Sequence, residues 1–294
     1  MKNLKLHGIF PALATAYRED ESIDEEQFRL LIRRLLPTVD GFVVNGTTGD
    51  FPLLTHAERR RAVEIVAEEV RGERLVIAGT GAIATGEAIT LTRAAQEAGA
   101  DAALVVAPYY LRPSAAGLQE HFSAIAAAVP ELPLLLYNFP QLVGQPIPVD
   151  VIRALQAAHA NIIGMKDTSG DLIYMLAVLE QLPADFNVLV GQGAVVLPAL
   201  AAGAVGAVLA CANLIPQQWQ QLLCALDQGE LESARAIQYQ AQQVSRLVGK
   251  GGSLTVRAGL KMLGLPIGPP RRPLTFEGAL TGADLAQLRA LLPA

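Results

Sequence analysis

The chain has 294 residues, of which 51% are hydrophobic and 17% are charged, which is enough for a large core in one or two domains. Its net charge of −5 and the lack of a long basic run argue against nucleic acid as a partner. No apolar run predicts a membrane-spanning helix or a signal peptide, so we expect a soluble protein of the cytoplasm.

Short apolar runs typical of strands alternate along the chain with segments of helical periodicity. The predicted strands are residues 8–14, 41–45, 75–78, 102–107, 132–138, 162–166, 186–190 and 206–210. The helices predicted to follow them are residues 23–36, 55–70, 86–98, 115–128, 149–158, 172–181, 195–202 and 216–226. Thr55, with Glu58 three residues later, predicts a capped start for the second helix.

Eight strand–helix units in roughly 225 residues are typical of a single (β/α)8 barrel. The predicted strands are apolar throughout rather than alternating, as expected for parallel strands that are covered on both faces. A doubly wound sheet is the alternative, but the first strand lacks the glycine-rich turn that usually follows it in that fold. We therefore predict an α/β TIM barrel over residues 1–228 and a C-terminal helical extension over 229–294, with helices at 232–248, 254–263 and 282–292.

Polar residues gather where the predicted strands end, which is the catalytic rim of a barrel. These segments are Asn45-Gly46-Thr47-Thr48-Gly49-Asp50, Pro108-Tyr109-Tyr110, Tyr137-Asn138-Phe139-Pro140, Lys166-Asp167-Thr168 and Gly191-Gln192-Gly193. Thr47 and Thr48 could hold a carboxylate, although the same glycine-flanked pattern also makes an ordinary tight turn. Tyr137 could transfer protons or simply fill the core, and Tyr109 and Tyr110 could line a site or an interface.

Lys166 is the only lysine between Lys5 and Lys250, in a stretch that uses arginine freely. It follows the apolar residues 161–165, which predicts a position at the end of a buried strand. A buried lysine can become neutral and attack a carbonyl group to form an imine, whereas arginine keeps its proton. The alternatives are a lysine that reaches the surface or one that pairs with Asp167.

Other kinds of chemistry have less support in the sequence. The four histidines precede the first predicted strand or fall on predicted helices, so a histidine metal site at the rim is not expected. The glycines of 79–81 and 249–251 do not complete a nucleotide-binding pattern. Cys211 and Cys224 lie in apolar surroundings typical of reduced, structural thiols. We therefore expect neither a metal nor an organic cofactor.

Taken in order, the motifs resemble those of the dihydrodipicolinate synthase and N-acetylneuraminate lyase family of class I pyruvate-dependent aldolases, over residues 6–292. The motifs are Gly46-Thr47-Thr48-Gly49-Asp50, Pro108-Tyr109-Tyr110, Tyr137-Asn138-Phe139-Pro140, Gly164-Met165-Lys166-Asp167-Thr168-Ser169-Gly170-Asp171 and Gly203-Ala204-Val205-Gly206 followed by Ala212-Asn213. The resemblance implies a (β/α)8 barrel with a helical C-terminal region. It also implies pyruvate as a substrate, no cofactor, and a homotetramer built as a dimer of dimers.

The resemblance also implies a role for individual residues. Lys166 would form a Schiff base with the keto carbon of pyruvate or another 2-oxo acid, and Tyr137 would be the general acid and base. Thr47 and Thr48 would bind the carboxylate of that substrate. Tyr110 would enter the site of a neighbouring subunit and complete a proton relay with Thr48 and Tyr137.

Three further positions bear on the substrate. Leu142 stands where dihydrodipicolinate synthases carry an arginine for the carboxylate of their aldehyde substrate, and this disfavours synthase activity. The backbone carbonyl of Val208 would face the imine. Gly193 stands where many relatives have an acidic residue, so Gln192 would bind substrate hydroxyls instead.

The motifs look more like those of 2-keto-3-deoxy sugar acid and 4-hydroxy-2-oxoglutarate aldolases. We therefore predict a Schiff-base lyase that cleaves or forms a 2-oxo-3-deoxy acid, giving pyruvate and an aldehyde when it cleaves. The alternatives are a dihydrodipicolinate synthase or a sugar acid dehydratase on the same scaffold. A protein that binds sugar acids without turnover is a further alternative.

Overall fold

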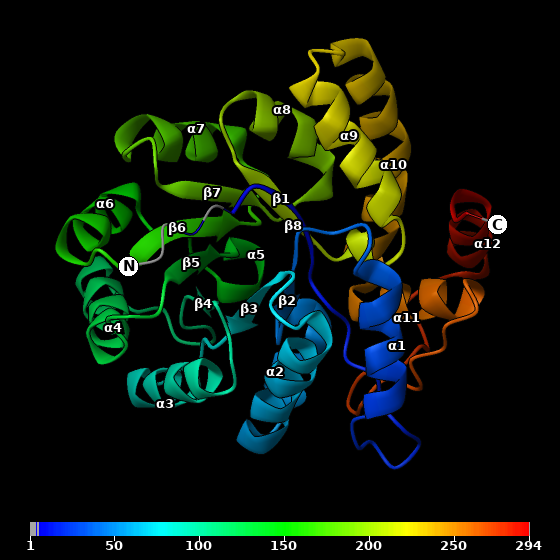
Figure 1. Ribbon diagram of the computed structural model, residues 1–294, viewed down its shortest axis with the longest axis horizontal. Helices are drawn as coiled ribbons and strands as arrows, with labels where there is room; N and C mark the ends of the chain where they lie inside the picture. The colour runs from blue at the N-terminus through cyan, green and yellow to red at the C-terminus, as the bar shows by residue number, and fades with distance from the viewer. Residues whose placement is uncertain (1–3, 5, 294) are drawn as a thin grey trace.

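A parallel barrel forms the centre of the computed structural model, which describes residues 4 and 6–293 (Figure 1). Eight strands pair in the order β1-β8-β7-β6-β5-β4-β3-β2, and every pairing is parallel. A bridge between Ala12 and Val43, with Leu13 N donating to Val43 O at 2.9 Å, closes the circle between the first and last strands of this order. The predicted barrel is therefore confirmed, and the doubly wound alternative is wrong.

The strands lie close to their predicted positions. They are β1 (Gly8–Pro11), β2 (Gly41–Val44), β3 (Leu75–Gly79), β4 (Ala102–Val106), β5 (Leu134–Asn138), β6 (Ile162–Asp167), β7 (Asn187–Val190) and β8 (Gly206–Leu209). The first strand is three residues shorter than predicted. Beyond Pro11 the pairing with neighbouring strands is reduced to the Ala12–Val43 bridge and single bonds, and Asn213 donates to Ala12 O at 2.7 Å and accepts from Ala14 N at 3.3 Å.

Helices surround the barrel in alternation with the strands (Figure 1). They are α1 (Glu25–Leu35), α2 (His56–Val70), α3 (Thr85–Glu97), α4 (Ala115–Ala128), α6 (Val149–Ala158), α7 (Leu172–Gln181), α8 (Val196–Ala201) and α9 (Pro216–Asp227). The capped start of α2 is confirmed, since the side chains of Thr55 and Glu58 each accept a bond from the other residue's backbone N–H. A short helix, α5 (Pro140–Val143), was not predicted. It begins at a proline, which suits the first turn of a helix.

The C-terminal helices α10 (Leu231–Gly251), α11 (Ser253–Met262) and α12 (Gly282–Leu291) lie on one side of the barrel, near α9 and α1 (Figure 1). They match the three predicted helices, with α10 longer than predicted at both ends. The division of the chain at residues 228 and 229 stays a prediction. Within the described residues, no helix has both the length and the hydrophobicity needed to cross a membrane.

Candidate active site

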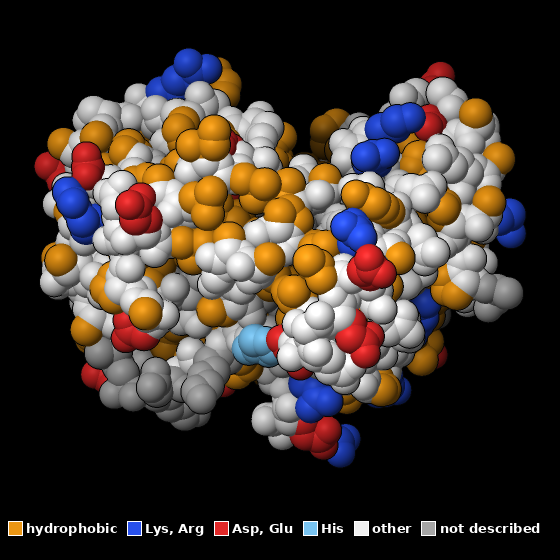
Figure 2. All heavy atoms as spheres, turned by 90° about the horizontal axis from the view of Figure 1, so that it is seen from above, with side chains coloured by type: hydrophobic (Ala, Val, Ile, Leu, Met, Phe, Trp, Pro, Cys, Tyr) orange, Lys and Arg blue, Asp and Glu red, His pale blue; other side chains and the backbone are white. Residues whose placement is uncertain are grey.

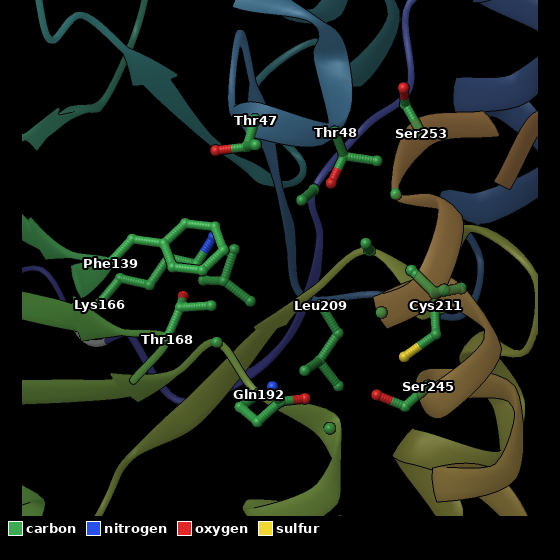
Figure 3. A pocket seen from close by; sticks show the side chains of 18 of the residues that line it. Thr47, Thr48, Phe139, Lys166, Thr168, Gln192, Leu209, Cys211, Ser245 and Ser253 are labelled. Atoms are coloured by element: carbon green, nitrogen blue, oxygen red, sulfur yellow. The ribbon is translucent and has the colours of Figure 1, made fainter. Parts of the chain in front are cut away.

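A cavity of about 260 Å³ lies at the carboxyl ends of the strands and extends to the α10–α11 junction (Figure 3). All of the predicted site residues except Tyr110 line it, namely Thr47, Thr48, Tyr137, Leu142, Lys166, Gln192 and Val208. Six of these residues lie near the carboxyl end of a strand or just after it, on five different strands, and Leu142 lies in the short helix α5. Barrel closure therefore brings them together although they are far apart in the sequence.

Lys166 is buried in the wall of this cavity, with only 4% of its surface exposed. It lies on β6 in register with Tyr137 on β5, and its Nζ is 4.2 Å from the centre of the Tyr137 ring. The alternative of a lysine that reaches the surface is therefore wrong. The expected competitor Asp167 has other partners, because its carboxylate accepts bonds of 2.7 Å from Asn138 Nδ2 and from Ser169 Oγ.

Asp167 points to the opposite side of the strand from Lys166, as neighbouring residues on a strand do. Burial raises the pKa of the Asp167 carboxyl, while the hydrogen bonds from Ser169 and Asn138 act in the opposite direction. This residue therefore belongs to a polar cluster behind the barrel wall. It leaves the amine of Lys166 facing the cavity, where it is placed to attack a carbonyl group.

The hydroxyl group next to that of Tyr137 belongs to Thr47, at an oxygen–oxygen distance of 3.4 Å. The structure thus pairs the Tyr137 hydroxyl with Thr47, while the expected relay through Thr48 stays a prediction. Both threonines lie in the 3₁₀ turn η1 (Thr47–Gly49), in which successive side chains are about 120° apart. Thr47 consequently faces the side of Lys166, whereas Thr48 lies nearer Ser253 (Figure 3).

The turn that carries both threonines is held in an unusual backbone shape. Asn45 before it and Asp50 after it both have φ of 56°, in the left-handed region. Gly49 has no room for a side chain, since a Cβ there would lie 2.9 Å from Leu13 O. The turn leaves the first N–H groups of η1 without partners inside the turn, which suits them to bind a carboxylate.

A buried ion pair connects this turn to the C-terminal helices. Arg257 on α11 donates to Asp50 Oδ2 at 3.1 Å, and both side chains are almost completely buried. The same guanidinium donates to Thr15 O at 2.6 Å and to Ile267 O at 3.0 Å. Arg257 thus fixes the residue that ends the threonine turn. Arg257 was not predicted from the sequence, although an arginine within the apolar residues of 254–260 is a signal of a buried charge.

Tyr110 is the one predicted site residue that does not line the cavity of its own chain. It is 90% exposed, and its φ of 70° places it in the left-handed region. The neighbouring Leu111 is also largely exposed. A large aromatic side chain held outward in this way is available to a second molecule, so the predicted role of Tyr110 in a neighbour's site stays a prediction.

Several further residues line the cavity; Thr168 and Gly191 were expected at the rim without a role, whereas Ser245 and Ser253 were not predicted. Thr168 has a buried hydroxyl group with no hydrogen-bond partner among the described residues. Gly191 keeps this region open, because a Cβ there would lie 1.9 Å from Thr168 Oγ1 and 2.9 Å from Lys166 Cε. Ser245 and Ser253 come from the C-terminal helices. Strand-end reasoning could not find these two serines because they lie on no strand.

The described residues contain no cluster of three or more histidine, cysteine, aspartate or glutamate side chains suited to hold a metal ion. The polar groups around the cavity are instead one amine, one phenol, one amide, one thiol and several hydroxyls. This set matches carbonyl chemistry that runs through a covalent imine.

Comparisons with known proteins give matches over most of the chain. A profile of the Dihydrodipicolinate synthetase family matches residues 5–289. The 4-hydroxy-tetrahydrodipicolinate synthase of Methanopyrus kandleri is 40% identical over 273 residues, which cover 92% of this chain and 91% of that protein. The 4-hydroxy-tetrahydrodipicolinate synthase structure from Methylacidiphilum fumariolicum SolV has a TM-score of 0.92 and 35% identity, covering 98% of this chain and 95% of that one. A prophage protein of E. coli K12, solved in complex with pyruvate, has a TM-score of 0.91 and 29% identity, with 98% of each chain covered.

The buried pair of Asp50 and Arg257 leads to a prediction about stability. Asp50→Asn leaves a buried guanidinium without its counter-charge, so we expect the free energy of unfolding to fall by about 3–5 kcal/mol. Guanidinium denaturation would measure the loss. The exposed pair of Asp150 and Arg153 offers a matched control, in which Asp150→Asn should cost less than about 1 kcal/mol. Equal effects of the two substitutions would contradict the role given to the buried pair.

Proposed function

The chain belongs to the dihydrodipicolinate synthetase family of class I pyruvate-dependent aldolases, and from this premise we propose that it acts through a Schiff base between Lys166 and pyruvate. The observation that carries the proposal is the buried amine of Lys166, which faces a cavity together with Tyr137 and Thr47. The reaction is the cleavage or formation of a carbon–carbon bond in a 2-oxo-3-deoxy acid, with pyruvate and an aldehyde on the cleaved side.

The proposed chemistry begins at the amine. Lys166 Nζ attacks the keto carbon of the 2-oxo acid, and the carbonyl oxygen leaves as water after two proton transfers, giving a protonated imine. A base then removes the proton from the hydroxyl group on the fourth carbon, and the bond between the third and fourth carbons breaks. Its electron pair passes into an enamine, and the fourth carbon leaves as the aldehyde carbon. The enamine then takes up a proton, and water releases pyruvate and restores the amine.

The residues around Lys166 fit the separate requirements of this cycle. Tyr137 and Thr47 are the proposed proton-transfer pair, because their hydroxyls lie near each other at the side of the amine. The face of the Tyr137 ring, 4.2 Å from Nζ, favours the positive charge of the imine when it forms. Thr47 and Thr48 are the proposed carboxylate-binding residues, and the Val208 carbonyl is proposed to face the imine.

A second candidate function is suggested by the names of the relatives, several of which are 4-hydroxy-tetrahydrodipicolinate synthases. That reaction joins pyruvate to an aldehyde that carries a carboxylate. Leu142, at the mouth of the cavity, argues against it here because an apolar side chain gives no charge to bind that group. A dehydratase, or a binding protein without turnover, remains a further alternative.

We also propose that the active form is a homotetramer, a dimer of dimers. Two apolar surfaces on different elements support this: Tyr110 and Leu111 after β4, and Ile173 and Leu176 on α7. Figure 2 shows hydrophobic side chains gathered on the face that carries α7 and α8. Two separate apolar surfaces suit the two kinds of contact in a dimer of dimers.

The proposed location is the cytoplasm, where thiols are kept reduced. Cys211 is buried and Cys224 exposed, and neither is in a disulfide. Burial raises the pKa of the Cys211 thiol to about 12, so it is an inert structural group at neutral pH.

Reductive trapping tests the proposed Schiff base directly. Incubation with pyruvate and borohydride should add a stable mass to a peptide that contains Lys166, detected by mass spectrometry. Lys166→Arg should abolish the adduct and reduce turnover by at least about a thousandfold, because arginine cannot form the imine. Turnover with Lys166 unmodified would refute the mechanism. Unchanged affinity of Lys166→Ala for acids without a keto group, with no turnover by the wild type, would favour the binding-protein alternative.

Leu142 separates the two candidate enzymes. We expect the wild type to condense pyruvate with aspartate semialdehyde poorly. We also expect Leu142→Arg to raise kcat/KM for that aldehyde at least about tenfold, by supplying a charged hydrogen bond to its carboxylate. Steady-state kinetics of both forms would measure this. Efficient condensation by the wild type would instead assign the synthase activity.

Tyr110 tests the proposed assembly. Sedimentation should show an oligomer, and Tyr110→Phe should remain one, because it keeps the apolar ring. If the hydroxyl takes part in a neighbour's relay, the substitution should lower kcat by about 10- to 100-fold. A fully active monomer, or a Tyr110→Phe form with unchanged kcat, would exclude that role.

A further inference from the structure

The threonine turn η1 packs against the helix α11 of the C-terminal region (Figure 3). Arg257 connects the two, and it binds groups from three separate segments of the chain. Its guanidinium donates to Asp50 Oδ2, to Thr15 O and to Ile267 O. Asp50 directly follows the turn, and its N–H donates to Thr47 O at 3.1 Å, so the position of its side chain constrains the turn.

Thr15 provides a second contact to the turn. Its hydroxyl group donates to Gly49 O at 2.8 Å, and the residue is almost completely buried. Gly49 is the last residue of η1, and the backbone carbonyl of the same Thr15 accepts a bond from Arg257. Arg257 therefore holds two successive residues, Asp50 directly and Gly49 through Thr15.

A second buried arginine holds the same connection between β2 and α2 at a later point. Arg271 lies after α11, and its guanidinium donates to Leu53 O at 2.8 Å and to the carboxylate of Glu58. Both guanidinium groups lie over the ring of Tyr17, 4.7 Å from its centre for Arg257 and 4.5 Å for Arg271. Two arginines of the C-terminal region therefore fix this connection.

These contacts lie behind the turn and outside the cavity. Thr47 and Thr48 line the cavity, whereas Asp50, Thr15 and Arg257 are not among the residues that do. A carboxylate bound by backbone N–H groups needs them at fixed positions, because a hydrogen bond weakens steeply as its angle departs from linear. The contacts of Arg257 therefore act on a bound carboxylate through the backbone of the turn, without touching it.

We propose that Arg257 and Asp50 are positioning residues that set the affinity of the site for the carboxylate of the 2-oxo acid. The pair holds the first N–H groups of η1 in place to donate to that carboxylate, while the imine forms on a different strand. Loosening the pair weakens binding of the charged acid and leaves the chemistry at Lys166 intact. This inference rests on the proposed function, which places the keto carbon at Lys166 and the carboxylate at the turn.

Reductive trapping at Lys166 measures this affinity in the full-length chain. Pyruvate is compared with its methyl ester, which keeps the keto group but has no carboxylate. The concentration that gives half of the maximal adduct is determined for each, and the ratio of ester to acid is the carboxylate selectivity. We expect Asp50→Asn to lower this selectivity by about tenfold, the value of one hydrogen bond to a charged group, and to leave trapping of the ester unchanged.

Two further variants separate positioning from charge and from stability. Thr15→Val removes the hydroxyl that binds Gly49 O without changing any charge, and the selectivity should fall by about three- to tenfold. Leu155→Ala removes a large buried side chain on α6, so it is the control for a loss of stability and should leave the selectivity unchanged. Thr15→Val also keeps the test informative if Asp50→Asn does not fold.

A charge effect without positioning would have the opposite sign. Asp50→Asn removes a negative charge beside the turn, so electrostatics alone would raise the affinity for the acid. The inference is overturned by an unchanged or raised selectivity in Asp50→Asn, by the same result in Thr15→Val where Asp50→Asn does not fold, or by an equal fall in Leu155→Ala.

The wild-type adduct with pyruvate separates these results from a failure of the proposed function. If the adduct forms and the selectivity behaves in one of these ways, the Schiff base stands and only the positioning role is wrong. If the wild type gives no adduct, the Schiff-base mechanism fails and the inference fails with it.

Discussion

The amine of Lys166 lies inside an aliphatic barrel, away from the carboxylate that follows it in the sequence. This placement is the constraint on which the site depends. It requires a parallel strand whose alternate residues face opposite sides, so that Asp167 bonds to Asn138 and Ser169 while the lysine faces the cavity. It also requires a neighbour without charge, which the ring of Tyr137 on the adjoining strand provides.

The C-terminal helices contribute more to the site than a covering for the barrel. Arg257 on α11 holds the end of the threonine turn through Asp50, and Gln238 on α10 holds the loop after β7. The barrel therefore supplies the groups proposed to react with pyruvate, while the helical region fixes two of the loops around them. It also supplies Ser245 and Ser253 to the lining of the cavity. Because the barrel and the helical region supply different walls of the cavity, substitutions in the helical wall can leave the imine-forming groups of the barrel in place.

Much of the fold followed from local patterns. Continuous apolar strands alternating with helices indicated the barrel, and Thr55 with Glu58 indicated the start of α2, which the structure confirms. The polar cavity residues Thr47, Thr48, Tyr137, Lys166 and Gln192 were also predicted, because polar groups at the ends of parallel strands must meet at one rim. Each of these inferences depends on residues that are neighbours in the sequence or on a rule that applies to every barrel.

Other features depended on contacts between distant segments. The first strand ends at Pro11, and after it Asn213, about two hundred residues away, binds Ala12 O and Ala14 N. The hydroxyl of Thr47, rather than that of Thr48, lies next to the Tyr137 hydroxyl, because the 3₁₀ turn directs the two threonine side chains to different sides. The order of the residues was sufficient to predict the pattern of strands and helices and the position of Lys166 at the end of a buried strand, since burial and periodicity are local signals. The partner of each side chain, and the wall that α10 and α11 build, required the folded chain, because they depend on distances and side-chain directions that no short stretch of sequence encodes.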